Sequence, residues 1–151
     1  MRRVASLIVF SLLVLACAKT ETAQTDTAAM TMAPAALTDA DFAGTWKGNA
    51  MMEGSDSVIA HWTQVCAAGT CTGTSEESKD TVVSTYRIDA DSSIGVTPPY
   101  VDPAVGTAQV IDHWVARVSN GRVTGTGRLV LADRPDSVVM RYRFEGSRTA
   151  P

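Results

Sequence analysis

The most reactive side chains in this sequence are those of three cysteines, Cys17, Cys66 and Cys71. Four residues, one of them Gly69, separate the last two, whereas a CxxC redox motif has two intervening residues. A short segment with a glycine is typical of a hairpin tip, where two facing cysteines can form a bridge. We therefore predict a structural disulfide between Cys66 and Cys71, worth about 2 kcal/mol on the chain-entropy model. Free thiols, and metal or redox chemistry, are the alternatives.

Cys17 stands at the end of an apolar segment that follows two arginines. This segment, residues 4–16, has thirteen residues, of which two serines are the only polar ones. A helix of that length rises roughly 20 Å, which is too short to cross about 30 Å of hydrocarbon. It has the length of the apolar region of a signal peptide. The sequence therefore predicts a signal helix over residues 1–16.

The stretch LVLAC, residues 13–17, resembles the lipobox of bacterial lipoproteins. The resemblance implies cleavage before Cys17, a thioether-linked diacylglyceryl group on its sulfur, and a further acyl chain such as palmitate on the new amino group. At about 0.8 kcal/mol per buried methylene, two or three chains anchor a protein to a membrane in effect permanently. In a cell with two membranes, the resemblance also implies the outer membrane, on the periplasmic side, because Ala18 rather than an aspartate follows the cysteine. The alternative is an ordinary cleaved signal peptide.

The two histidines, His61 and His113, are each followed by a tryptophan. Successive side chains of a strand point to opposite faces, so tryptophans that face a core would leave both histidines on the outer surface. No cluster of His, Cys and Asp has zinc-site spacing, and the sequence contains no nucleophile elbow, Walker A segment or dinucleotide fingerprint. We therefore expect no metal, no cofactor and no catalytic activity.

Length and composition predict one folded domain behind a tether. The chain has 151 residues and a formal net charge of −3, whereas a nucleic-acid-binding domain would be basic. From Ala18 to Leu37, twelve of twenty residues are Ala or Thr, a composition that cannot bury enough apolar surface to fold. We therefore divide the chain into a signal peptide (1–16), a lipidated cysteine with a disordered linker (17–37) and an all-β domain (38–148).

The domain shows the alternation of β-strands almost throughout. In residues 138–145, Val, Met, Tyr and Phe alternate with charged residues, and a period of two indicates a half-buried strand. Asn120-Gly121 is a strong hairpin-turn signal between strands at 108–118 and 122–131. Further strands are predicted near 44–52, 57–66, 71–77, 81–88 and 92–97. Eight short antiparallel strands favour an up-and-down meander closed as a barrel, with a β-sandwich as the alternative.

The tripeptide Gly44-Thr45-Trp46, at the start of the first strand, resembles the G-x-W of lipocalins, which are calycin-type β-barrels. In lipocalins this tryptophan closes one end of the barrel and packs against an arginine from beyond the last strand, and Arg148 is the matching residue here. The resemblance covers the tripeptide and the predicted topology. It implies a lipocalin-like barrel with an internal ligand.

These features predict an envelope lipoprotein whose barrel binds a small apolar molecule, with Trp46, Trp62, Trp114 and Tyr142 lining the interior or the rim. The alternative is a non-catalytic structural or interaction module with a filled core, whose outer face meets an envelope protein. Eight strands fit both, because such a barrel can be filled by side chains or hold one small ligand. The segment Thr97–Thr107, with three prolines, is predicted either to cross a barrel mouth as a lid or to form a rigid surface connection.

Overall fold

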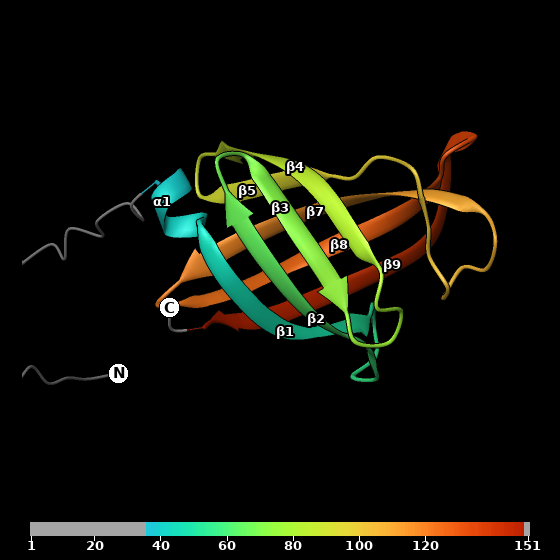
Figure 1. The fold of residues 1–151 in the computed structure, drawn as a ribbon, viewed down its shortest axis with the longest axis horizontal. Helices are drawn as coiled ribbons and strands as arrows, with labels where there is room; N and C mark the ends of the chain where they lie inside the picture. Colours follow the sequence, from blue (N-terminus) through green and yellow to red (C-terminus); the bar gives the residue numbers. More distant parts are fainter. Residues whose placement is uncertain (1–35, 150–151) are drawn as a thin grey trace, which may run out of the picture. The chain divides into compact units, whose positions relative to one another are not determined.

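A computed structural model of the protein describes residues 36–149, which form one short helix and a sheet of nine strands (Figure 1). The predicted signal peptide and Cys17 lie outside the described residues. The elements follow one another as α1 (Asp39–Phe42), β1 (Gly44–Met52), β2 (Val58–Ala67), β3 (Thr70–Ser75), β4 (Thr81–Asp89), β5 (Ser92–Val96), β6 (Tyr100–Val101), β7 (Gln109–Ser119), β8 (Arg122–Leu131) and β9 (Arg134–Arg148).

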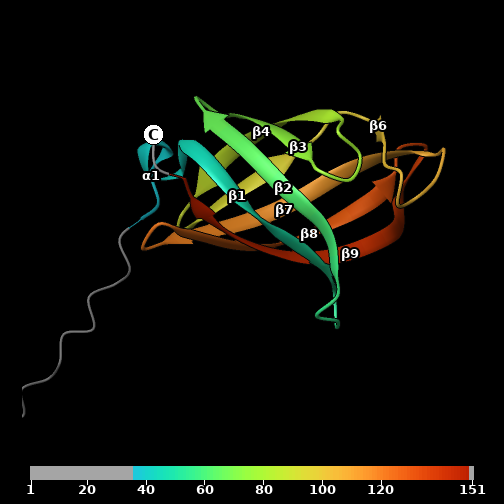
Figure 2. The same cartoon turned by 60° about the horizontal axis from the view of Figure 1, so that its bottom comes forward.

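The strands close into an eight-stranded antiparallel barrel. Neighbours in sequence pair from β1 to β5 and from β7 to β9, while β9 also pairs with β1 and β5 also pairs with β7. The two-residue β6 adds to β7 beyond the end of β5. The predicted all-β meander and its closure as a barrel, rather than a sandwich, are therefore confirmed, and Figure 2 shows the ring of strands from a second side.

Two hairpins follow the turn chemistry read from the sequence. Asn120 and Gly121 have φ of 52° and 71°, so both take the left-handed conformation that a tight hairpin turn of type I′ needs. Ala68 and Gly69, with φ of 48° and 78°, do the same between β2 and β3. This second turn places Cys66 directly opposite Cys71, and the two sulfurs are bonded. The predicted disulfide is present at the hairpin tip.

The last hairpin differs from the prediction in where its strand begins. The alternation indicated a strand over residues 138–145, but β9 already begins at Arg134, which pairs with Leu131. Pro135 lies beside a register shift of the β8–β9 ladder, between Val130 and Leu131. Proline lacks the N–H that a regular ladder needs, and an irregular place in a sheet tolerates it.

One end of the barrel, which we call the closed end, is sealed by α1. Thr38 and Asp41 form a capping box at the start of this helix. Phe42 at its end is 2% exposed and packs against the rings of Tyr86, at 4.9 Å between centroids, and Trp114, at 5.9 Å. One helical turn is too short to show a 3.6-residue period, so the sequence reading did not find it.

Trp46 also belongs to the closed end. Its indole N–H donates a hydrogen bond of 2.9 Å to the carbonyl of Phe42, and its side chain is 1% exposed. The Arg148 guanidinium lies over the ring at 4.8 Å from its centroid and donates a hydrogen bond to the carbonyl of Asp41. The G-x-W tryptophan and its arginine therefore meet as the lipocalin resemblance implied.

Glycines on the inner face of the barrel provide room for aromatic rings on neighbouring strands. A Cβ built on Gly95 would overlap Trp114, and one built on Gly127 would overlap Tyr142. In each case the glycine stands directly opposite the aromatic residue in the ladder. A glycine inside a strand often marks the close approach of another group, and at these two positions that group is an aromatic ring.

Candidate functional site: a half-open barrel cavity

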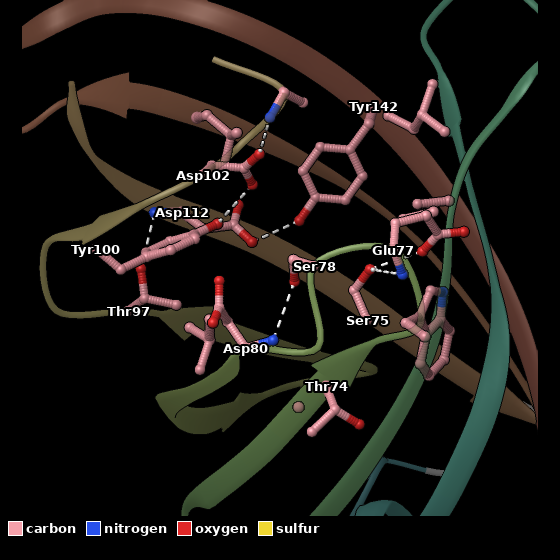
Figure 3. Close-up of a pocket in the computed structure, with 18 of the residues that line it drawn as sticks. Thr74, Ser75, Glu77, Ser78, Asp80, Thr97, Tyr100, Asp102, Asp112 and Tyr142 are labelled. Carbon is pink, nitrogen blue, oxygen red and sulfur yellow. Dashed lines mark hydrogen bonds between the residues drawn. The ribbon is translucent and has the colours of Figure 1, made fainter. Parts of the chain in front are cut away.

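The half of the barrel away from α1, which we call the open half, contains a cavity of about 320 Å³. Aromatic and aliphatic side chains from several strands form much of its wall, and polar side chains gather near its mouth (Figure 3). The barrel is thus filled at the closed end and hollow at the other. The apolar part of the lining includes Ala50, Trp62, Val82, Trp114, Leu129, Met140 and Phe144, and the polar part includes Ser84, Thr97, Tyr100, Asp102, Asp112 and Tyr142.

Three of the four predicted ligand residues line this cavity. Trp62 and Phe144 meet edge to face at 6.0 Å between ring centroids, and Tyr142 lies 6.1 Å from Phe144, which makes a continuous aromatic wall. Trp114 forms the floor, because its ring faces the cavity and also stacks on Phe42 of the closed end.

Trp46, the fourth predicted ligand residue, is not among the residues that line the cavity. It lies at the beginning of β1, near α1, where its side chain is packed in the closed end and its N–H is used by the Phe42 carbonyl. Strand alternation correctly places it on the inner face, but it does not reveal the height along the barrel axis at which the filled part ends. We therefore do not include Trp46 in the candidate site.

Asp112 is the functional candidate that the sequence reading missed. It shares the inner face of β7 with Val110 and Trp114, so a carboxylate interrupts an otherwise apolar face. The Tyr142 hydroxyl donates a 2.6 Å hydrogen bond to Oδ2, while Oδ1 is buried and has no hydrogen-bond partner among residues 36–149. The signal in the sequence was an acidic residue two positions before Trp114, on the same face of the predicted strand.

The surroundings of Asp112 disfavour its charged form. Burial raises the pKa of the Asp112 carboxyl to about 7, the hydrogen bond from Tyr142 lowers it, and the nearby negative charge of Asp102 adds to the rise. Burial also raises the pKa of the Tyr142 and Tyr100 hydroxyls, and the charge of Asp112 adds to both effects. Perturbed titrating groups that face a cavity are typical of binding and catalytic sites.

The proline-rich segment after β5 lies at the mouth of the cavity. Tyr100, Val101, Asp102 and neighbouring residues contribute to its lining, and in Figure 1 the segment stands at the end of the barrel opposite α1. The backbone N–H of Asp112 donates to the Thr97 hydroxyl at 2.9 Å, and the Tyr100 hydroxyl donates to Asp102 at 3.3 Å (Figure 3). Of the two predicted roles of this segment, the structure therefore favours a cover at the barrel mouth.

Two further buried polar atoms of the lining lack partners. The indole N–H of Trp62 on β2 and the hydroxyl of Ser84 on β4 make no hydrogen bond with any residue of the described chain. Buried polar groups are nearly always hydrogen-bonded, and leaving one unsatisfied costs about 1–3 kcal/mol. Together with Asp112, they give the cavity one unused donor, one unused hydroxyl and one unused acceptor.

The histidines lie away from the cavity lining. His61 is exposed, and its Nδ1 lies 2.7 Å from Oε1 of Glu77. Hydrogen bonds from Ser75 and then His61 lower the pKa of the Glu77 carboxyl to about 2. Within residues 36–149, no group of three His, Cys, Asp or Glu side chains has the geometry to hold a metal ion.

Comparison of the chain with protein-family models, with curated proteins and with solved structures finds no match. None of the helices in the described part of the chain has the length and apolar character needed to cross a membrane.

Proposed function

We propose that the protein binds a small, largely apolar molecule in the open half of its barrel. The observation that supports this function is an aromatic-walled cavity of about 320 Å³ in which buried polar atoms have no protein partner. Pockets for small ligands measure roughly 300–1,000 Å³ and combine apolar walls with a few polar groups. The cavity lies at the low end of that range, so the ligand is small.

The filled-core alternative fits only the closed end, where Phe42, Trp46 and Tyr86 pack together. We propose a binding role rather than catalysis, because the sequence contains no nucleophile elbow, Walker A segment or dinucleotide fingerprint. We therefore propose a non-catalytic binding protein of lipocalin-like architecture. The contact of Arg148 with Trp46 supports that resemblance.

We further propose that the protein is a lipoprotein of the cell envelope, anchored through Cys17 to the outer membrane and facing the periplasm. The support is the lipobox-like stretch at residues 13–17 and the Ala/Thr-rich segment that follows it. We expect labelled palmitate to enter the full-length protein in a bacterial host and to be lost in Cys17→Ala. Equal labelling of the variant, or an unprocessed chain recovered from the cytosol, would contradict the anchor but not the cavity.

A neutral fluorescent apolar probe, such as N-phenyl-1-naphthylamine, tests the binding function. We expect saturable 1:1 binding with a rise in emission, because the probe leaves water for an aromatic cavity. Ala60→Trp places a large ring in the cavity lining and should weaken binding at least about tenfold, which corresponds to 1.4 kcal/mol.

The matched control is Val65→Trp, which adds the same ring at a position of β2 that is 50% exposed. This variant should bind the probe like the parent protein. Urea unfolding of both variants shows whether each is folded. The absence of saturable binding by the folded parent protein would contradict the proposed function and favour the structural or interaction module.

A further inference from the structure

The charges around the cavity all have one sign. Four carboxylates, those of Glu77, Asp80, Asp102 and Asp112, belong to its lining, and no Lys, Arg or His of the described chain does. They come from the turn between β3 and β4, from the segment at the mouth, and from β7. Of these four, Glu77 also pairs with the exposed His61, whose Nδ1 lies 2.7 Å from Oε1 of Glu77. Such a lining attracts a positively charged ligand and repels an anion.

Three of these carboxylates lie at the rim, where Glu77 and Asp80 are exposed and Asp102 is half-buried. Glu77 accepts hydrogen bonds from Ser75 and from the backbone of His61. Asp102 accepts from the Tyr100 hydroxyl and from the backbone N–H of Ala104, at 2.9 Å. An acidic rim of this kind would by itself be compatible with a solvated surface. A ligand is indicated by the fourth carboxylate, that of Asp112.

Asp112 differs from the rim residues because its Oδ1 atom is buried without a hydrogen-bond partner in the described chain, so that the carboxylate is only half satisfied. Figure 3 shows its carboxylate between Tyr100, Tyr142 and Asp102, with a bond to the Tyr142 hydroxyl at Oδ2. Oδ1 has no donor among residues 36–149. An unpaired buried carboxylate oxygen is costly, and a donor supplied by a ligand would remove that cost.

The aromatic wall next to Asp112 also suits a positively charged ligand. Tyr142, which donates to Asp112, contacts Phe144, and Phe144 in turn contacts Trp62. Aromatic faces attract ammonium groups and also bury an apolar body. The Asp112 carboxylate and the aromatic side chains therefore lie side by side on one wall of the cavity.

We propose that the ligand is a small amine with an apolar body, whose ammonium group is bound by Asp112 while the body lies against Trp62 and Phe144. This inference rests on the proposed binding function and adds the chemical class of the ligand. The ammonium N–H donates to the free Oδ1, and the charge of Asp102 at the mouth adds to the attraction. An anionic molecule of the same shape is rejected, since it would place like charges together in a poorly solvated cavity.

The test uses three molecules that share one ring: 2-phenylethylamine, 2-phenylethanol and phenylacetate. Each competes at pH 8 with the neutral probe N-phenyl-1-naphthylamine on the full-length protein. We expect the amine to bind at least about tenfold more tightly than the alcohol, and phenylacetate to bind most weakly, because a hydrogen bond to a charged group is worth about 1.5–3 kcal/mol.

Asp112→Asn keeps the shape of the side chain and removes its charge. It should weaken binding of the amine at least about tenfold while changing the affinity for the alcohol and the probe less than about threefold. Asp89→Asn is the matched control, since Asp89 is an exposed residue of β4 outside the cavity, and it should change none of the three affinities.

The outcomes separate the two proposals. If the probe binds but the amine competes no better than the alcohol, or if Asp112→Asn leaves the amine's affinity unchanged, the amine proposal is overturned and the binding function stands. If none of the three molecules displaces a bound probe, the amine proposal is likewise overturned. If the probe itself does not bind the folded protein, the binding function fails and the amine proposal fails with it.

Discussion

Asp112→Asn should stabilise the protein at pH 8 by up to about 4 kcal/mol and remove most of the pH dependence of its stability between pH 5 and pH 8. In the folded state burial raises the pKa of Asp112 to about 7, whereas an unfolded aspartate titrates near 3.9. Between these two values the folded chain holds a proton that the unfolded chain does not. Its free energy of unfolding therefore falls as pH rises, by about 1.4 kcal/mol per unit, until the pH passes 7.

The groups that face Asp112 also favour a free energy of unfolding that falls as the pH rises. Tyr142 and Tyr100 have pKa values raised above the ordinary value for tyrosine, so both stay neutral over this range. Asp102 adds negative charge, which disfavours ionisation of Asp112. Glu77 acts at lower pH, because its pKa is lowered in the folded protein. The stability that it contributes is present above its unfolded pKa and is lost only as the pH falls toward about 2.

Urea unfolding at pH 5, 6.5 and 8 measures the effect. The parent protein should lose stability steadily over this series, and Asp112→Asn should not. Asp89→Asn, an exposed change of the same kind, should follow the parent. Parallel pH profiles for the parent and Asp112→Asn would show that Asp112 is solvated in the folded protein.

The second large effect is expected at the closed end, where Phe42→Ala should destabilise the fold by about 4 kcal/mol. Its ring is 2% exposed and contacts the rings of Trp46, Tyr86 and Trp114. Truncation of a buried phenylalanine typically costs about 3–5 kcal/mol, from lost burial and from the space left behind. The hydrogen bond from Trp46 uses the carbonyl of Phe42, so the variant retains it.

Equilibrium unfolding in urea measures this loss, with Val65→Ala as the control. Val65 is 50% exposed on β2, and its truncation should change the free energy of unfolding by no more than about 0.5 kcal/mol. A loss below about 1 kcal/mol for Phe42→Ala would mean that the one-turn helix does not seal the barrel. Probe binding at the open half should persist in Phe42→Ala at low urea, since Phe42 is not part of the cavity lining.

Most of the fold could be predicted from local sequence signals. Alternation of apolar and charged residues marked the strands, and Asn120-Gly121 marked a turn that takes the expected conformation. Closure of the barrel depends on pairings between distant segments, β9 with β1 and β5 with β7, for which no local pattern exists. The number of strands and their short connections therefore predicted a barrel, while a β-sandwich stayed as the alternative.

The site was only partly predictable because alternation distinguishes inward from outward but not filled from hollow. Trp46, Trp62 and Trp114 all face inward, yet Trp46 is packed under α1 while the other two line the cavity. Phe42 fills the barrel interior up to the ring of Trp114. It comes from α1, a helix that is too short to recognise in the sequence. Asp112 escaped notice because an inward carboxylate has meaning only once the interior around it is known to be open.

The indole N–H signals of the three tryptophans give the most direct test of a barrel that is filled at one end and binds a ligand at the other. In a ¹⁵N-labelled sample titrated with N-phenyl-1-naphthylamine, the Trp62 and Trp114 signals should shift and saturate together, because both rings line the cavity. The Trp46 signal should stay in place, because its N–H is bonded to Phe42 in the closed end. Unchanged signals from Trp62 and Trp114 at saturating probe, or an equal shift at Trp46, would contradict the account.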